Sequence, residues 1–230
     1  YGKARRGWLG VQIQPVTREI AESFGLKEPR GALVSLVNED SPAAKAGIRD
    51  GDIILSFGGA SIDEMRTLPR QVANTPLGQR VPVTVWRGGK QQQLTVTVAE
   101  MKAGADAESP SQPYRQEDAP IAGTLYFYGM EMAAITSALR EQFSMPPSLA
   151  GVLLLEVNES SEASEKGLKP GDVLVEVNQQ AVKTPEQVKK ILQDSVAKGR
   201  RTALFRIVTQ EGDRVFVALP LPERFGERDG

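Results

Sequence analysis

The sequence holds 230 residues, of which 40% are apolar and 25% charged, with a net charge of −1, and this length suffices for two globular domains of ordinary size. The charge balance gives no overall attraction to nucleic acid, and no apolar run reaches the length of a membrane span. The chain has no cysteine and no histidine, which excludes disulfides, thiolate chemistry and a Ser-His-Asp triad within these residues. We expect no catalytic residue, no cofactor and no metal site here.

The chain opens with Tyr1 rather than Met, and residues 1–6 lack the apolar stretch of a signal peptide. We therefore expect the sequence to be part of a longer protein.

Residues 6–11 (Arg-Gly-Trp-Leu-Gly-Val) predict a loop that becomes a strand, because an alternating segment follows and ends at Pro15. Gly10 has no Cβ, so the backbone N–H groups of Leu9, Gly10 and Val11 can converge on one anion. An amide loop at the head of an open strand can hold the C-terminal carboxylate of another chain, whose last residues then add a strand to the sheet. The alternation of Leu9, Val11 and Ile13 is equally typical of an ordinary half-buried strand.

The positions of glycines, prolines and capping residues predict where the helices and strands after this loop begin and end. We expect a short helix capped by Thr17, a small-residue helix capped by Ser41, and a longer helix whose regular part starts near Thr67 because it contains Pro69. Strands are predicted at 32–37 and 53–57, a turn at 51–52, and a closing hairpin that pairs 81–86 with 94–98. The Gly51-Asp52 pair is expected to be a plain turn, too sparse with Asp50 for a calcium site.

Residues 101–120 contain three prolines and no Leu, Ile or Val, with a net charge of −2. Such a segment cannot bury enough apolar surface to order itself, so we expect a semi-flexible linker.

The second half repeats the first. Residues 31–55 and 151–175 agree at ten of twenty-five positions with no gap, and a shift of 119 aligns residues 8–11 with 127–130, so the opening loop is expected to be duplicated as well. The second copy has a predicted helix at 136–143, a capping box that starts a helix at Thr184, and a closing hairpin of 202–208 with 215–219.

The loop 6–11, the run 41–48 and the turn 51–52 with its apolar strand resemble a bacterial PDZ domain. Two such domains in tandem resemble the C-terminal half of an HtrA/Deg-type (DegP-like, Do-like) periplasmic serine protease. The resemblance implies a mostly β fold with short helices: two partly open β-barrels or sandwiches in tandem, circularly permuted so that the ligand-binding strand comes first. The expected boundaries are domains at 1–100 and 121–222, the linker at 101–120 and a loose tail at 223–230.

Carried over by position, the resemblance implies a peptide-binding site with a carboxylate loop, a pairing strand and a far wall on the longer helix. Its residues are Trp8, Leu9, Gly10, Val11, Ile13, Met65, Pro69 and Val72.

The second copy departs from this pattern, because Tyr128 replaces Leu9, Lys189 replaces Pro69 and no basic residue lies near the loop. We expect its apolar surface to serve as a groove or, more in keeping with these changes, as an interface between domains or subunits. The residues assigned to it are Phe127, Tyr128, Gly129, Met130, Met132, Val188 and Leu192.

These observations predict a non-enzymatic peptide-recognition module that grips C-terminal or exposed hydrophobic segments of misfolded proteins by β-strand addition. The resemblance adds a serine endoprotease domain before Tyr1, a periplasmic location, a role in protein quality control and stress response, and a homo-oligomer of the full-length protein. The alternative is a purely structural module that assembles the subunits. Nucleic acid and membrane partners are not expected.

Overall fold

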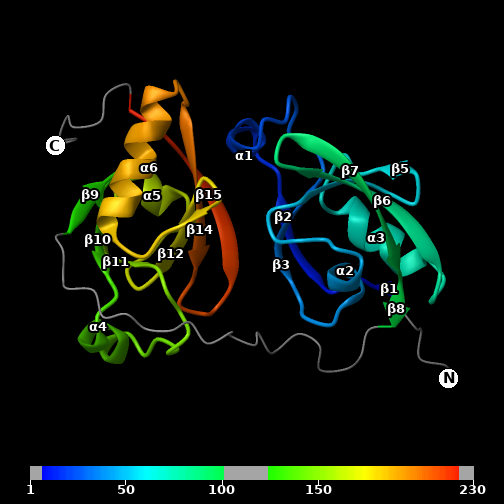
Figure 1. Ribbon diagram of the computed structural model, residues 1–230, viewed down its shortest axis with the longest axis horizontal. Coiled ribbons are helices and arrows are strands. Elements are labelled where there is room, and N and C mark those ends of the chain that lie inside the picture. The colour runs from blue at the N-terminus through cyan, green and yellow to red at the C-terminus, as the bar shows by residue number, and fades with distance from the viewer. Residues whose placement is uncertain (1–6, 101–123, 223–230) are drawn as a thin grey trace. The chain divides into compact units, whose positions relative to one another are not determined.

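The computed structural model describes residues 7–100 and 124–222 (Figure 1). These residues form two compact units, one on each side of the gap. The predicted linker at 101–120 and the predicted tail at 223–230 lie outside the described residues.

The first unit is mostly β, with three short helices. Its elements are β1 (Gly7–Trp8), β2 (Val11–Pro15), α1 (Arg18–Ser23), β3 (Ala32–Val37), α2 (Pro42–Lys45), β4 (Ile53–Phe57), β5 (Ala60–Ser61), α3 (Thr67–Asn74), β6 (Arg80–Arg87), β7 (Lys90–Thr97) and β8 (Ala99–Glu100). The main sheet runs β2-β3-β4-β6-β7 with β5 on β4, and β1 pairs separately with β8. Because the sheet does not close on itself, β2 lies at one of its ends.

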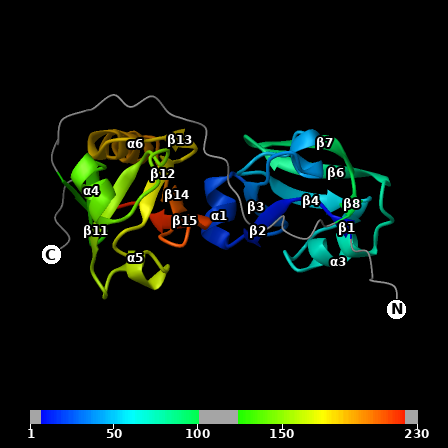
Figure 2. The same cartoon turned by 90° about the horizontal axis from the view of Figure 1, so that it is seen from below.

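The predicted capping residues define where the helices of this unit begin. Thr17 accepts a hydrogen bond from the N–H of Ile20, and Ser41 accepts one from the N–H of Ala44. Helix α3 begins at Thr67, as predicted, so that Pro69 falls in its first turn, where a missing N–H costs nothing. Figure 2 shows α3 beside β1.

The second unit repeats this plan with one change. Its elements are β9 (Leu125–Phe127), β10 (Met130–Ala134), α4 (Ser137–Gln142), β11 (Val152–Val157), α5 (Glu162–Glu165), β12 (Val173–Val177), β13 (Gln180–Ala181), α6 (Pro185–Ala197), β14 (Thr202–Val208) and β15 (Arg214–Pro220). The sheet runs β15-β14-β12-β11-β10-β9, with β13 on β12. A strand, β9, therefore forms within the segment where we expected the opening loop to be duplicated.

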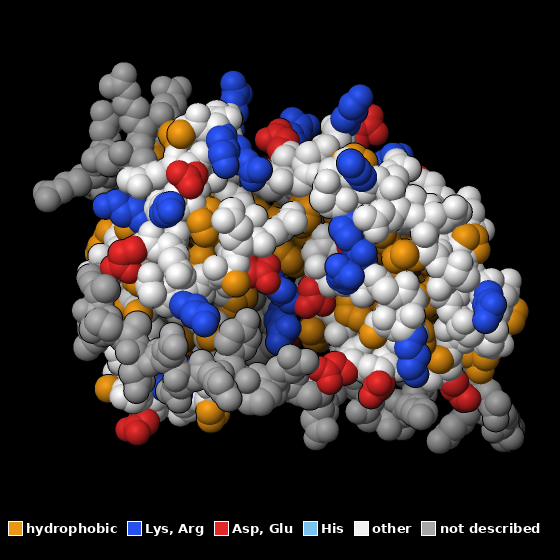
Figure 3. Space-filling view, viewed as in Figure 1, with side chains coloured by type: hydrophobic (Ala, Val, Ile, Leu, Met, Phe, Trp, Pro, Cys, Tyr) orange, Lys and Arg blue, Asp and Glu red, His pale blue; other side chains and the backbone are white. Residues whose placement is uncertain are grey.

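Each unit has its own apolar core between sheet and helices. In the first unit, the indole N–H of Trp86 donates to the carbonyl of Phe24 at 2.8 Å and so ties the end of α1 to the sheet. On the face drawn in Figure 3, basic and acidic side chains are interspersed.

Candidate functional site

Strand β2 is an edge strand whose outer side is unpaired among the described residues. The carbonyl of Gly10 accepts from the N–H of Asn38 at 2.9 Å, and Gln12 stands opposite Leu36, so the even-numbered residues bond to β3. The backbone groups of Val11 and Ile13 consequently point away from the sheet. Pro15, which has no N–H, also lies on this outward side, where an edge strand tolerates it. A further strand can add along this edge.

The loop before β2 is fixed with its carbonyls turned inward. The carbonyl of Leu9 accepts from the N–H of Ala43 at 2.9 Å, and that of Gly10 from Asn38. Within the described part of the chain, the N–H groups of Leu9 and Gly10 donate to no backbone carbonyl. These backbone amides therefore lie at the head of the open strand, where the sequence predicts an anion-binding loop.

No other residue can take the place of Gly10 without distorting this loop. Its φ is +76°, and a Cβ built there would lie 2.3 Å from the Cβ of Ser41 and 2.9 Å from the ring of Trp8. Ser41 is buried and caps α2, so it cannot move aside. The loop therefore requires glycine for its conformation and for its close packing.

Apolar side chains extend from the loop to helix α3. Leu9 and Val72 are buried in the core, while Val11, Ile13 and Met65 are partly buried and pack against it. Partial burial leaves these three side chains accessible at the surface. Pro69, which we expected in the far wall, is exposed on α3, and the buried residues of the helix are Leu68 and Val72.

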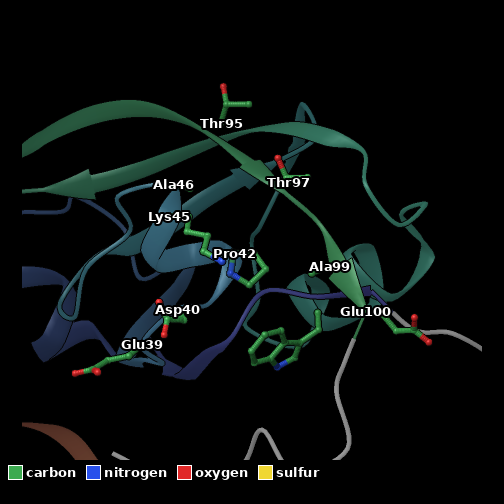
Figure 4. A pocket seen from close by; sticks show the side chains of 10 residues that line it. Glu39, Asp40, Pro42, Lys45, Ala46, Thr95, Thr97, Ala99 and Glu100 are labelled. Atoms are coloured by element: carbon green, nitrogen blue, oxygen red, sulfur yellow. The ribbon is translucent and has the colours of Figure 1, made fainter. Parts of the chain in front are cut away.

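A separate hollow of about 570 Å³ lies in the same unit (Figure 4). Of the predicted site residues, only Trp8 lines it, and the remaining lining comes from residues beside and within α2 and from the end of β7 and β8. Its charged lining residues are Glu39, Asp40, Lys45 and Glu100. Because these segments are far apart in the sequence, no local pattern could have predicted this hollow.

The structure does not show the apolar surface that we predicted for the second unit, because most of the residues assigned to it are buried. Phe127, Met130 and Met132 are at most 8% exposed, and Val188 and Leu192 are fully buried. These five side chains form the core between β9, β10 and α6, and Tyr128 packs against it. Strand β9 pairs with the edge of β10, so these positions do not stand beside an open strand edge in this unit.

The loop of the second unit also differs from that of the first. Tyr128 has a φ of +49° and Gly129 a φ of +70°, and two positive values in a two-residue connection define a type I′ hairpin turn. The bond from Asn158 to the carbonyl of Gly129 is retained at 2.8 Å. Among the described residues, Ala163 donates no bond to Tyr128 that would match the bond from Ala43 to Leu9. The opening loop is therefore not duplicated in its conformation.

The two Gly-Asp turns are structural, as predicted. The Asp52 carboxylate is buried and receives Nε and Nη2 of Arg87 at 2.7 and 2.6 Å, and this hydrogen bonding raises the pKa of Arg87. In the second unit Asp172 is equally buried. Both carboxylates also accept a backbone N–H, Asp52 that of Arg49 at 2.8 Å and Asp172 that of Lys169 at 2.9 Å. Burial raises the pKa of Asp172, and backbone hydrogen bonds from Lys169 and Gln210 oppose that shift in part.

The described residues include no group of three or more acidic side chains placed to hold a metal ion. Asp50, considered as a calcium ligand, accepts a hydrogen bond from the N–H of Val37 at 2.7 Å. No helix within residues 7–100 and 124–222 is long and apolar enough to cross a membrane.

Family comparisons identify both halves. One model of the PDZ domain matches residues 7–98, and another matches residues 155–206.

Curated relatives match nearly the whole chain. A probable periplasmic serine endoprotease, DegP-like, of Brucella suis biovar 1 (strain 1330) is 38% identical over 220 residues, which are 96% of this chain and 40% of the relative. Relatives with the same description from Rhizobium meliloti (strain 1021) and Pseudomonas savastanoi pv. phaseolicola are 38% and 37% identical, and the match covers 42% and 44% of their lengths. The chain thus spans about two fifths of the length of these relatives.

Solved structures are similar over less of the chain. The HtrA-type protease AlgW with decapeptide is 40% identical over 43% of this chain and 30% of its own, with a TM-score of 0.40. The serine endoprotease from Yersinia pestis is 30% identical over 44% of this chain and 31% of its own, with a TM-score of 0.36.

Proposed function

Because this chain belongs to the PDZ domain family and carries one such domain in each half, we propose that its first domain binds C-terminal or exposed hydrophobic segments of other polypeptides. The observation that carries this proposal is the unpaired edge of β2 directly beside a loop of backbone amides. A peptide pairs antiparallel with β2 through Val11 and Ile13, and its terminal carboxylate lies against the N–H groups of Leu9, Gly10 and Val11.

Side-chain burial adds selectivity to this backbone pairing. The last side chain of the peptide lies between β2 and α3, among Val11, Met65 and the buried Leu9 and Val72. These neighbours are all apolar, so the site favours an apolar terminal residue. Alternate residues of an added strand point to opposite faces, so the third-last side chain also faces the domain.

The affinity of this site should be modest. A few main-chain hydrogen bonds and one buried side chain are offset by the entropy lost when the peptide becomes ordered. We expect micromolar dissociation constants, which correspond to about −7 to −8 kcal/mol.

We further propose that the chain is the recognition and regulatory module of a periplasmic serine endoprotease that degrades misfolded proteins. Support comes from relatives described as periplasmic serine endoproteases, which match 96% of this chain. The remaining length of those relatives leaves room for a protease domain, which this histidine-free chain does not supply. The alternative is a purely structural module that assembles the subunits, and the apolar residues that we assigned to its interface in the second domain do not support it, because most of them are buried.

The proposal is tested by titrating the chain with a short peptide that ends in an apolar residue, as the free acid and as the C-terminal amide. Hydrogen bonds to a charged carboxylate are worth about 1.5–3 kcal/mol, so the free acid should bind about 10- to 100-fold more tightly. A peptide with the same composition but a terminal Asp controls for the apolar site. Equal affinity of acid and amide would exclude the carboxylate loop, and no saturable binding of either would exclude the peptide site.

A further inference from the structure

The second domain differs from the first at the edge where a ligand strand would add. Strand β2 of the first domain has an unpaired outer side, whereas the corresponding strand β10 pairs with β9 on that side. Met130 stands opposite Phe127, and Met132 stands opposite Leu125.

The two edges are equivalent residue for residue. In both domains the carbonyl of the loop glycine accepts from an asparagine N–H, Asn38 to Gly10 and Asn158 to Gly129. This common bond fixes the phase of both strands, and it turns the backbone groups of Met130 and Met132 outward as it does those of Val11 and Ile13. In the second domain these groups face β9. Strand β9 therefore occupies the position that a peptide would take on the first domain.

Strand β9 also has the direction and the side chains of a ligand. It runs antiparallel to β10, and its C-terminal end meets the loop. Leu125 and Phe127 point inward and pack in the core with residues of α6, whereas Tyr126 between them is 65% exposed. Phe127 takes the place of the terminal side chain, and the peptide bond to Tyr128 replaces the terminal carboxylate.

Two substitutions between the copies explain the change. In the first domain Gly7 passes so close to α3 that a Cβ would lie 2.2 Å from the carbonyl oxygen of Val72. The corresponding residue in the second domain is Tyr126, which cannot fit against a helix backbone at that distance. Tyr128, in place of Leu9, adopts a positive φ and closes the I′ turn that folds β9 back onto β10.

We infer that β9 is a built-in ligand of the second domain, which leaves each chain with one site for a foreign peptide, on the first domain. The strand is joined to β10 by a two-residue turn, so its effective concentration is at least millimolar. A peptide of micromolar affinity at micromolar concentration cannot displace it. The second groove becomes available only when β9 detaches.

Amide hydrogen exchange in the unaltered chain tests this inference without any mutation. In the free protein, the amides of Met130 and Met132 should exchange at least about 100-fold more slowly than those of Val11 and Ile13. A saturating peptide should slow Val11 and Ile13 and leave Met130 and Met132 unchanged. Fast exchange at Met130 and Met132 in the free protein would overturn the inference.

The inference rests on the peptide site of the proposed function, but the experiment can refute the two independently. If a peptide slows none of these amides, the proposed function is wrong, while slow exchange at Met130 and Met132 still supports a paired β9.

A substitution in β9 extends the test to site number. Leu125 stands at a hydrogen-bonded position opposite Met132, so Leu125→Pro removes an N–H from the ladder and loosens β9. The matched control is Tyr126→Pro, whose N–H points away from β10. In chains that also carry Gly10→Ala to silence the first site, Leu125→Pro should create one peptide site and Tyr126→Pro none. A saturable site on β10 in Gly10→Ala alone would overturn the inference.

Discussion

Replacing Gly10 by alanine should abolish most peptide binding while leaving the chain folded. The new Cβ would lie 2.3 Å from that of Ser41 and 2.9 Å from the ring of Trp8, at a φ of +76°. Apolar carbon atoms normally stay about 3.5–4 Å apart. The loop therefore has to shift by more than about 1 Å to relieve the contact with Ser41, and the ring of Trp8 has to move as well. A non-glycine residue in this conformation costs about 1–2 kcal/mol in addition.

A loop that shifts in this way no longer aims its N–H groups at the carboxylate. Losing the charge-assisted hydrogen bonds costs about 1.5–3 kcal/mol, so titration calorimetry should show an affinity loss of about 10- to 100-fold. Thermal unfolding should show a domain weakened by a few kcal/mol at most, because Gly10 lies in a loop and not in the sheet.

The second domain supplies the matched control, Gly129→Ala. Its φ is +70°, and a Cβ there would lie 2.6 Å from that of Ser161, so the local strain is similar. Its effect on peptide affinity at the first site should be negligible. Wild-type affinity in Gly10→Ala, or an equal loss in both variants, would refute the assignment of the carboxylate loop to residues 9–11.

Three further substitutions test the structural roles of buried groups. Burial raises the pKa of Asp172, so the folded domain takes up a proton at a higher pH than the unfolded chain and gains stability as the pH falls between the two pKa values; Asp172→Asn should remove this gain in unfolding midpoints measured against pH, and an unchanged profile would contradict it. Arg87→Met strands the buried carboxylate of Asp52 and should cost about 3 kcal/mol in chemical denaturation, whereas a loss below about 1 kcal/mol would place the pair among weak surface bridges. Trp86→Phe removes the hydrogen bond to Phe24 and should lower stability by about 1 kcal/mol without changing peptide affinity; a weaker affinity would link α1 to the site.

Most of the fold could be predicted because local signals agree with the tertiary structure. Thr17 and Ser41 cap helices where the sequence indicates, and the glycine pair 88–89 closes the predicted hairpin of β6 and β7. The late start of α3 followed from one residue, Pro69, which cannot lie in a helix interior.

The second loop could not be predicted from its similarity to the first. The aligned positions suggested a duplicated loop, but its conformation depends on whether residue 126 can pack against a helix as Gly7 does. That requirement is a tertiary contact between segments far apart in the sequence. The exchange of glycine for tyrosine was the available signal, and its meaning depends on knowing that β1 touches α3.

The pairing of β9 with β10 explains why the sequence placed buried residues of the second domain at its surface. Met130 and Met132 alternate as groove residues would, but β9, which carries Phe127, pairs with β10, and all three side chains are buried. The pairing of Asp52 with Arg87 was also missed, since the two residues are 35 positions apart. A Gly-Asp turn indicates where the carboxylate lies but gives no information about its partner.

The most direct measurement of the central claim is the set of amide shifts and intermolecular NOEs in the complex with a free-acid peptide. The account predicts the largest shifts at residues 9–13 and NOEs from the peptide backbone to Val11 and Ile13 in an antiparallel register. Shifts concentrated at the hollow around Lys45, or along β10, with the amides of β2 unchanged, would contradict it.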